Sequence, residues 1–225
     1  MIPYKLIDTA SEHGTTMRLY QRGEEFSIRV DKAGELMNSR QHHSEDILAE
    51  LACKKISDRK NTHLLVGGLG MGFTLEAALL HSGASSRITV SELMPAVVRW
   101  NREYIGAFAG FPLKDKRVDV IEQDVGKVMR EHKNEFDAIM LDVDNGPDGF
   151  TRQGNGALYN LYGLKHAYDA LKPGGVLTVW SATSDTAFTQ RMKKVGFKVD
   201  EQRVRAHKSQ SSSRHTIWIG VRANR

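Results

Sequence analysis

The sequence has little cysteine, no long apolar run and no metal-binding pattern, and each of these absences excludes a class of protein. A single thiol, Cys53, cannot form an intramolecular disulfide. Among the nine histidines only His42 and His43 are adjacent, and no spacing is typical of metal ligands, so we expect no metal. The sequence contains no run of 18 or more apolar residues that would predict a membrane span, and residues 1–14 do not resemble a secretory signal. We therefore expect a soluble, cytoplasmic protein that does not bind membranes.

Charge is distributed unevenly along the chain, whose formal net charge is +5. From Arg191 to the C-terminus there are ten lysines and arginines against two acidic residues, whereas the preceding part is slightly acidic. A basic segment can attract RNA, DNA or an acidic protein, but charge alone selects no ligand. No run of aromatic residues alternates with these basic ones, as base stacking would require. We therefore favour a solvated surface over nucleic-acid binding.

The first forty residues contain short alternating runs separated by turn residues, which is typical of a small β meander. We expect its strands at residues 15–21, 26–30 and 35–40. A helix follows at residues 44–56, with Ser44 as its predicted N-cap and apolar residues at helical spacing.

From residue 61 onward, strand-like and helix-like runs alternate strictly, which is the pattern of a parallel sheet covered on both faces. Strands are expected at residues 62–68, 87–92, 118–124, 136–143 and 174–181. Helices are expected at residues 73–83, 95–105, 125–133, 158–175 and 185–197. Two last strand-like runs, 198–206 and 215–223, predict an antiparallel hairpin at the sheet edge. The predicted regions are a small N-terminal β region (1–41), a connecting helix (42–60) and a Rossmann-like catalytic domain (61–225).

A glycine-rich turn separates the first strand of the main domain from its helix. Gly67, Gly68, Gly70 and Gly72 lie in this turn, where missing side chains let the backbone pass close to a ligand. The turn suits a nucleotide-like molecule. Phe73 stands where a dinucleotide fold would have the last glycine of G-x-G-x-x-G, so the glycines alone do not identify the ligand.

Three successive strands of the main domain end in an acidic residue: Glu92, Asp124 and Asp142. Because the carboxyl ends of neighbouring strands line one crevice in a doubly wound sheet, we expect these side chains to converge beside the glycine turn. Glu92 lies twenty residues beyond Gly72, the distance of a carboxylate that binds ribose hydroxyls. Asp124 could then accept a hydrogen bond from the exocyclic amine of an adenine, or it could cap the next helix. Asp142 could likewise have no role beyond ending its strand.

This arrangement resembles the class I fold of enzymes that use S-adenosylmethionine and, within it, the spermidine synthase family of aminopropyltransferases. The segments that carry the resemblance are residues 64–72, 90–98, 136–147 and 158–177. We therefore predict an α/β fold with a doubly wound, mostly parallel seven-stranded sheet of the class I methyltransferase type. A C-terminal antiparallel hairpin and a small N-terminal β region complete it.

The resemblance implies transfer of an aminopropyl group from decarboxylated S-adenosylmethionine to an amine such as putrescine, by a homodimer without a metal. Asp142 matches the family's base, and a half-buried carboxylate can both attract an ammonium and accept its proton. The cofactor-binding residues that the resemblance implies are Gly67, Gly68, Gly70, Gly72, Glu92, Asp124 and Val125.

The acceptor side departs from the family pattern. Gly70 stands where the family has an acid, and Asn145 stands where it has a second aspartate. Asp144 and Asp148 lie near enough in sequence to substitute for that aspartate, and Trp180 replaces a polar contact with a flat apolar wall. These departures remove part of the family's diamine and donor recognition, so the sequence does not identify the acceptor.

Two further residues are predicted to bind the acceptor. His43 lies near the family's substrate-contacting Tyr-His-Glu, although a solvated helix start explains it equally well. Tyr159 follows a glycine-rich segment, residues 149–156, that could close as a lid, whereas the spacing of Tyr162 favours the core.

Two other functions fit the same sequence. The first is a methyltransferase that uses intact S-adenosylmethionine on a small polar or nucleic-acid acceptor, because loss of the acid at Gly70 removes a charge that would repel the donor's carboxylate. The second is a protein that keeps the nucleoside pocket without turnover, since fold alone does not establish function.

Overall fold

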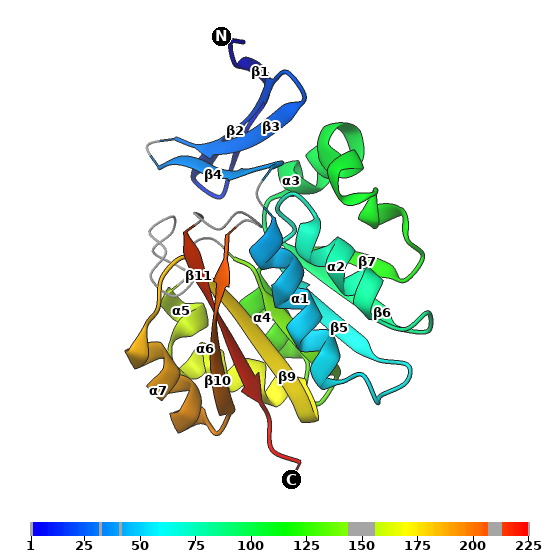
Figure 1. Ribbon diagram of the computed structural model, residues 1–225, viewed down its shortest axis with the longest axis vertical. Helices are drawn as coiled ribbons and strands as arrows, with labels where there is room; N and C mark the ends of the chain where they lie inside the picture. Colours follow the sequence, from blue (N-terminus) through cyan, green and yellow to red (C-terminus); the bar gives the residue numbers. More distant parts are fainter. Residues whose placement is uncertain (1, 32, 41, 144–155, 207–212, 225) are drawn as a thin grey trace.

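Two β-sheets and a set of flanking helices make up the computed structural model (Figure 1). The structure describes residues 2–31, 33–40, 42–143, 156–206 and 213–224. The strands of the smaller, N-terminal sheet are β1 (Lys5–Glu12), β2 (Thr15–Arg22), β3 (Glu25–Val30) and β4 (Gly34–Asn38). They pair antiparallel in chain order, which is the meander that the sequence predicted. The first strand, β1, was not predicted, because it is an edge strand with a single buried residue and no clear apolar alternation.

The larger sheet has seven strands in the order β10-β11-β9-β8-β5-β6-β7. Their bounds are β5 (His63–Gly67), β6 (Arg87–Glu92), β7 (Val118–Glu122), β8 (Phe136–Leu141), β9 (Leu171–Ser181), β10 (Lys198–Arg205) and β11 (Arg214–Val221). Strands β5 to β9 run parallel, and β11 pairs antiparallel with both β9 and β10. The predicted doubly wound sheet with its C-terminal hairpin is confirmed. Strand β5 has β6 on one side and β8 on the other, so the strand order reverses there and opens a crevice at the carboxyl ends.

Helices cover both faces of this sheet (Figure 1). The helices are α1 (His43–Lys55), α2 (Phe73–His81), α3 (Pro95–Trp100), α4 (Val125–Glu131), α5 (Gly156–Tyr159), α6 (Leu161–Ala170) and α7 (Thr186–Val195), and three short turns are η1 (Asn101–Ile105), η2 (Gly106–Ala109) and η3 (Pro112–Lys114). Successive residues of β5 point to opposite faces: Leu64 and Val66 pack into one apolar cluster and Leu65 into the other. Within the described ranges, no helix is long and apolar enough to cross a bilayer.

Several details of the helices differ from the sequence predictions, and residues 171–175, expected at the end of a helix, lie in β9. The expected helix over 158–175 is broken at Asn160, whose extended backbone and side chain cap α6 by accepting from the amides of Tyr162 and Gly163. Tyr162, predicted to lie in the core, is 80% exposed because this break turns it outward. Helix α1 begins at His43 after the N-cap His42, so the prediction of Ser44 as N-cap was wrong.

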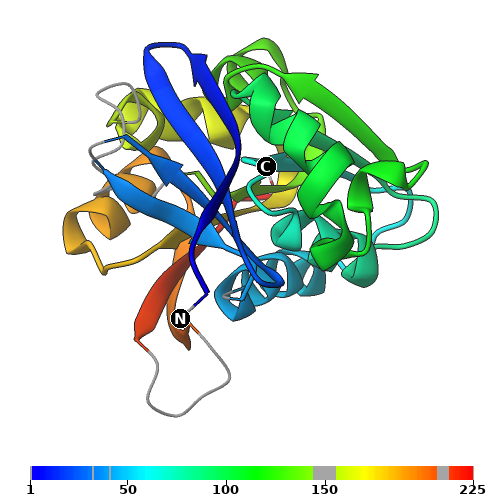
Figure 2. The same ribbon diagram turned by 90° about the horizontal axis from the view of Figure 1, so that it is seen from above.

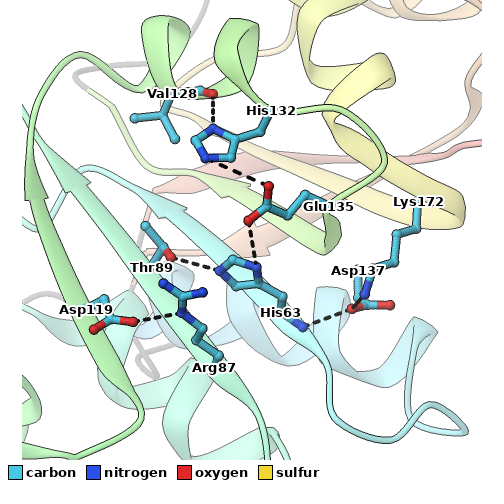
Figure 3. A network of polar contacts seen from close by, with 9 residues as sticks. All are labelled: His63, Arg87, Thr89, Asp119, Val128, His132, Glu135, Asp137 and Lys172. Atoms are coloured by element: carbon cyan, nitrogen blue, oxygen red, sulfur yellow. Dashed lines mark hydrogen bonds and ion pairs between the residues drawn. The ribbon is translucent and has the colours of Figure 1, made fainter.

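A polar network holds the amino ends of the parallel strands (Figure 3). The buried carboxylate of Asp137 accepts from Lys172 Nζ at 2.7 Å, from the amide of His63 at 2.9 Å and from Arg59 at 2.9 Å. Burial opposes ionisation of Asp137, but these donors outweigh it and lower its pKa. The ring of His63 contacts both Glu135 and Thr89, and burial lowers its pKa. These contacts fix one end of the sheet and leave the carboxyl ends for a ligand.

Candidate active site

The crevice at the carboxyl ends of β5, β6, β7 and β8 is covered by the N-terminal sheet. Seen from above, the strands of that sheet lie across the main sheet (Figure 2). Between them is a cavity of about 110 Å³. Thr15, Met17, Val30, Leu36 and Met37 line it from the N-terminal sheet. The main domain contributes Gly68, Gly70, Glu92, Asp124, Val125 and Asp142, among others. The structure therefore brings most of the predicted cofactor residues together on one cavity.

The glycine turn approaches its neighbours more closely than any side chain would allow. The amide of Gly68 donates to the carbonyl of Ser91 at 2.9 Å, and the amide of Asp142 donates to the carbonyl of Gly67 at 2.9 Å. Gly68 has φ +88°, and a Cβ there would clash with the carbonyl oxygen of Asp142. A Cβ on Gly67 would lie 2.8 Å from Val125. A side chain at either position would force a neighbouring residue to move, because the turn packs directly against these neighbours.

A residue that the sequence did not indicate holds the far side of the turn. Asn101 is buried, and its amide nitrogen donates to the carbonyl of Gly70 at 2.8 Å and to that of Val97 at 3.0 Å. It stands where α3 changes into the π-helical turn η1. Local propensity gives no signal for such a change, so sequence reasoning could not have identified this residue.

Glu92 is 8% exposed and joins the glycine turn to the start of α3. Its Oε2 accepts from the amide of Leu69 at 2.8 Å, and its Oε1 accepts from the amide of Met94 at 2.9 Å. Burial raises the pKa of Glu92 although these amides favour the ionised form. The amides of Leu93 and Gly70 also favour the ionised form, and the carboxylate lines the cavity where a ligand could reach it.

Asp124 both caps a helix and lines the cavity. Its Oδ1 accepts from the amide of Lys127 at 2.9 Å, which is an N-cap of α4. The capping alternative considered from the sequence is therefore present, and the predicted contact with an adenine remains a prediction. Val125, the first residue of α4, lines the same cavity.

Asp142 lies just beyond β8 and lines this cavity together with a second one. Its Oδ2 accepts from Thr74 Oγ1, in the first turn of α2, at 2.7 Å. Burial raises the pKa of Asp142, and the hydrogen bond from Thr74 opposes that shift. Of the described residues that line both cavities, Asp142 is the one with a carboxylate, so it could act where a donor in one cavity meets an acceptor in the other.

The second cavity, of about 70 Å³, is lined by two carboxylates and Asn38 together with several apolar side chains. Its lining residues are Leu36, Met37, Asn38, Glu45, Leu69, Gly70, Met71, Phe73, Asp142 and Trp180. Burial, and next the charge of Asp142, raise the pKa of Glu45 to about 8. No lysine or arginine is among the residues lining either cavity in the described part of the chain.

Sequence reasoning missed Glu45 and selected its neighbour His43. The signal was present, because Glu45 lies in the segment that resembles the family's Tyr-His-Glu. The prediction chose the adjacent histidines as acceptor-binding residues instead, and it placed the start of the helix at Ser44. In the structure α1 starts at His43, and Glu45, not His43, reaches a cavity.

The remaining candidate residues lie elsewhere. Tyr159 is buried against Phe188, its hydroxyl donates to the carbonyl of Val143 at 3.2 Å, and it lines neither cavity. Asp144, Asp148 and most of the predicted lid lie outside the described residues. Among the residues that the structure does describe, no group of three or more His, Cys, Asp or Glu side chains could hold a metal ion.

A mostly parallel seven-stranded sheet, with β11 inserted antiparallel between β9 and β10 and a glycine turn after β5, is the class I methyltransferase type of fold. A spermine/spermidine synthase domain model matches residues 42–200, so the chain belongs to that family.

Several relatives and solved structures share this similarity. The polyamine aminopropyltransferase of Thermoanaerobacter sp. (strain X514) is 32% identical over 116 residues, which cover 51% of this chain and 38% of that protein. Polyamine aminopropyltransferase 1 of Aquifex aeolicus is 29% identical over 139 residues, which cover 59% and 46%. The matched part thus spans less than half the length of these curated relatives.

The solved structures show the same fold over nearly the whole chain. Spermidine synthase from Thermotoga maritima matches with a TM-score of 0.76 at 18% identity, over 98% of this chain and 74% of that one. A spermidine synthase in complex with the transition-state analogue AdoDATO matches with a TM-score of 0.75 at 18% identity, over 98% of this chain and 73% of that one.

Proposed function

We propose that the protein is a transferase that moves an aminopropyl group from decarboxylated S-adenosylmethionine to an amine such as putrescine. Membership in the spermine/spermidine synthase domain family supports this, and the curated relatives are named polyamine aminopropyltransferases. The observation that carries the proposal is the position of Asp142, which lines both cavities at the end of β8.

The larger cavity is the proposed nucleoside site. Glu92 accepts from the ribose hydroxyls, and Asp124 accepts from the exocyclic amine of the adenine. Gly68 and Gly70 let the turn approach the sulfonium end of the donor, and Val125 packs against the base. Bound here, the donor points its aminopropyl group toward Asp142.

The smaller cavity is the proposed acceptor site, and Asp142 is the proposed base. An ammonium cannot attack until it loses a proton, which the Asp142 carboxylate accepts. The free amine nitrogen attacks the methylene next to the sulfonium, so a C–N bond forms while the C–S bond breaks and its electron pair stays on sulfur. Neutral methylthioadenosine leaves, and the proton from Asp142 returns to solvent. Holding donor and acceptor in adjoining cavities supplies the alignment that the reaction needs.

Incubation with putrescine and each donor tests the function directly. Methylthioadenosine formed only with decarboxylated S-adenosylmethionine supports the proposal, whereas S-adenosylhomocysteine formed from S-adenosylmethionine would establish methyl transfer instead. If calorimetry detects binding of neither nucleoside, both activities are refuted.

The resemblance also supports a homodimer in the cytoplasm. Analytical ultracentrifugation of the purified chain tests the dimer, and a monomer at micromolar concentration would contradict it. Binding to RNA that weakens as salt rises would show a nucleic-acid role for the basic C-terminal segment, which we do not favour.

A further inference from the structure

The acceptor cavity contains one carboxyl group more than the proposed base. Glu45 and Asp142 both line it, and neither has a lysine or arginine beside it in the described part of the cavity wall. The charge of Asp142 disfavours ionisation of Glu45. Two carboxylates that share a half-buried site without a cationic partner are unfavourable unless a proton or a positively charged ligand lies between them.

We propose that Glu45 is a second acceptor-binding carboxylate, which binds the ammonium group of the amine together with Asp142, and that the free cavity holds a proton that leaves when the amine enters. This inference rests on the proposed function of the same site. It assigns Glu45 to binding and positioning and leaves proton removal from the attacking nitrogen to Asp142.

Contacts outside the cavity hold Glu45 in place. Ser44 Oγ donates to Glu45 Oε2 at 2.6 Å, and His215 Nδ1, on β11, lies 3.0 Å from the same hydroxyl. Ser44 itself is buried. A glutamate fixed by a buried hydroxyl in the first turn of a helix is preorganised, so less side-chain entropy is lost when it binds a cation.

The other walls of the cavity suit the alkyl part of an amine. Met37, Phe73 and Trp180 contribute apolar surface. Aromatic faces also attract a cation when one lies near them. The indole Nε1 of Trp180 is buried and has no hydrogen-bond partner among the described residues, so a polar ligand group could satisfy it. A pair of carboxylates beside apolar side chains matches an ammonium group that carries a methylene chain.

Several charged or titratable groups lie on the elements around Glu45, and two of them shift its pKa. Asp142 at the end of β8 and Asp46 on α1 raise the pKa of Glu45. His42 pairs with Asp46 and stacks on Phe73 at 4.4 Å, Glu76 lies on α2, and His215 contacts Ser44.

The pKa of about 8 sets the direction of the effect. At pH 7 Glu45 is mostly protonated in the free protein. An ammonium in the cavity favours the carboxylate, lowers the pKa of Glu45 and releases its proton to solvent. Above pH 8 Glu45 is already ionised, so the release declines as pH rises through that value.

Isothermal titration calorimetry with putrescine tests the inference on the protein saturated with methylthioadenosine. Titrations at pH 7 in phosphate and in Tris, which differ in ionisation enthalpy, give the number of protons released. We expect close to one proton for the wild type and none for Glu45→Gln. Loss of one charge-assisted contact should also weaken putrescine binding about 10- to 100-fold.

Glu50→Gln is the matched control, because Glu50 is exposed on the same helix and the substitution makes the same change of side chain outside the cavity. It should release the same proton as the wild type and bind putrescine equally well. Affinity for methylthioadenosine and the melting temperature of both variants report whether the fold is intact. In activity assays Glu45→Gln should raise KM for putrescine far more than it lowers kcat.

Equal proton release by the wild type and Glu45→Gln, or equal putrescine affinity, would overturn the inference. If the wild type forms methylthioadenosine and such an equality is found, the inference fails alone and the proposed function stands. If the wild type is inactive but putrescine still displaces one proton that depends on Glu45, the amine site stands and the proposed transfer fails.

Discussion

A single methyl group at Gly68 should disturb both stability and turnover, because this glycine meets two separate restrictions. Its φ of +88° lies in a region that side chains rarely adopt, and an added Cβ would lie well inside 3.0 Å of the carbonyl oxygen of Asp142. The first restriction costs about 1–2 kcal/mol for an alanine. The second adds roughly 1–3 kcal/mol, as overpacking in a core does. Gly68→Ala should therefore lower the free energy of unfolding by about 2–5 kcal/mol.

Gly34 separates the two effects. It has φ +89°, but a Cβ there would meet nothing within 4 Å. Gly34→Ala should therefore cost only the conformational part, about 1–2 kcal/mol. The difference between the two variants measures the clash with Asp142.

The same clash predicts the effect on catalysis. Relief of it requires the main chain at Asp142 to shift, and displacement of a catalytic group by about 1 Å can cost roughly a hundredfold in rate. We expect kcat of Gly68→Ala to fall by about that factor and kcat of Gly34→Ala to change little. Urea unfolding and methylthioadenosine formation are the two assays. The reasoning is refuted if the two variants lose equal stability and Gly68→Ala keeps full turnover.

Three further substitutions test the roles assigned to single carboxylates. Asp142→Asn should keep nucleoside affinity within about threefold while kcat falls roughly 10²–10⁴-fold, as for loss of a general base; calorimetry showing lost nucleoside binding would make Asp142 structural. Glu92→Gln turns an amide NH2 toward the amide of Leu69 or Met94, so nucleoside affinity should fall at least about tenfold, which fluorescence or calorimetric titration measures. Asp137→Asn should cost about 3 kcal/mol in urea unfolding at pH 7. Because the folded pKa of Asp137 is lowered, its contribution is complete above about pH 4 and is lost as pH falls further, so the variant and the wild type should converge in acid, and a constant difference would contradict this.

Hydrophobic periodicity was enough to predict the elements that form the main sheet. The run Leu64, Leu65 and Val66 is buried throughout, as a strand covered on both faces must be, and the structure places its residues in two separate clusters. The edge strand β1 carries no such pattern and was missed. The break at Asn160 was missed because a cap depends on the backbone of one residue, which periodicity averages over.

The site was predictable where it depends on strand ends and not where it depends on tertiary contacts. Glu92, Asp124 and Asp142 follow directly from the rule that parallel strands end at one edge, and all three line the larger cavity. Glu45 comes from a helix outside the alternating segment, and Asn101 acts through a π-helical turn. Their positions follow from how the N-terminal segment and α3 pack, which no local pattern encodes. The proposed division into three regions, the dimer and the residue roles stay predictions.

The hydrogen bonds around Glu92 and Asp142 give a physical reason for assigning them different roles. Both are carboxyl groups whose pKa burial raises. Backbone amides on both oxygens hold Glu92, and backbone donors cannot rotate away or accept a proton in exchange. Such a group is suited to a fixed ionic acceptor for ribose hydroxyls. Asp142 has one donor among the described residues, the rotatable hydroxyl of Thr74, on Oδ2. Its other oxygen can take a proton and release it without breaking a backbone contact, which is what a base at the junction of two cavities requires.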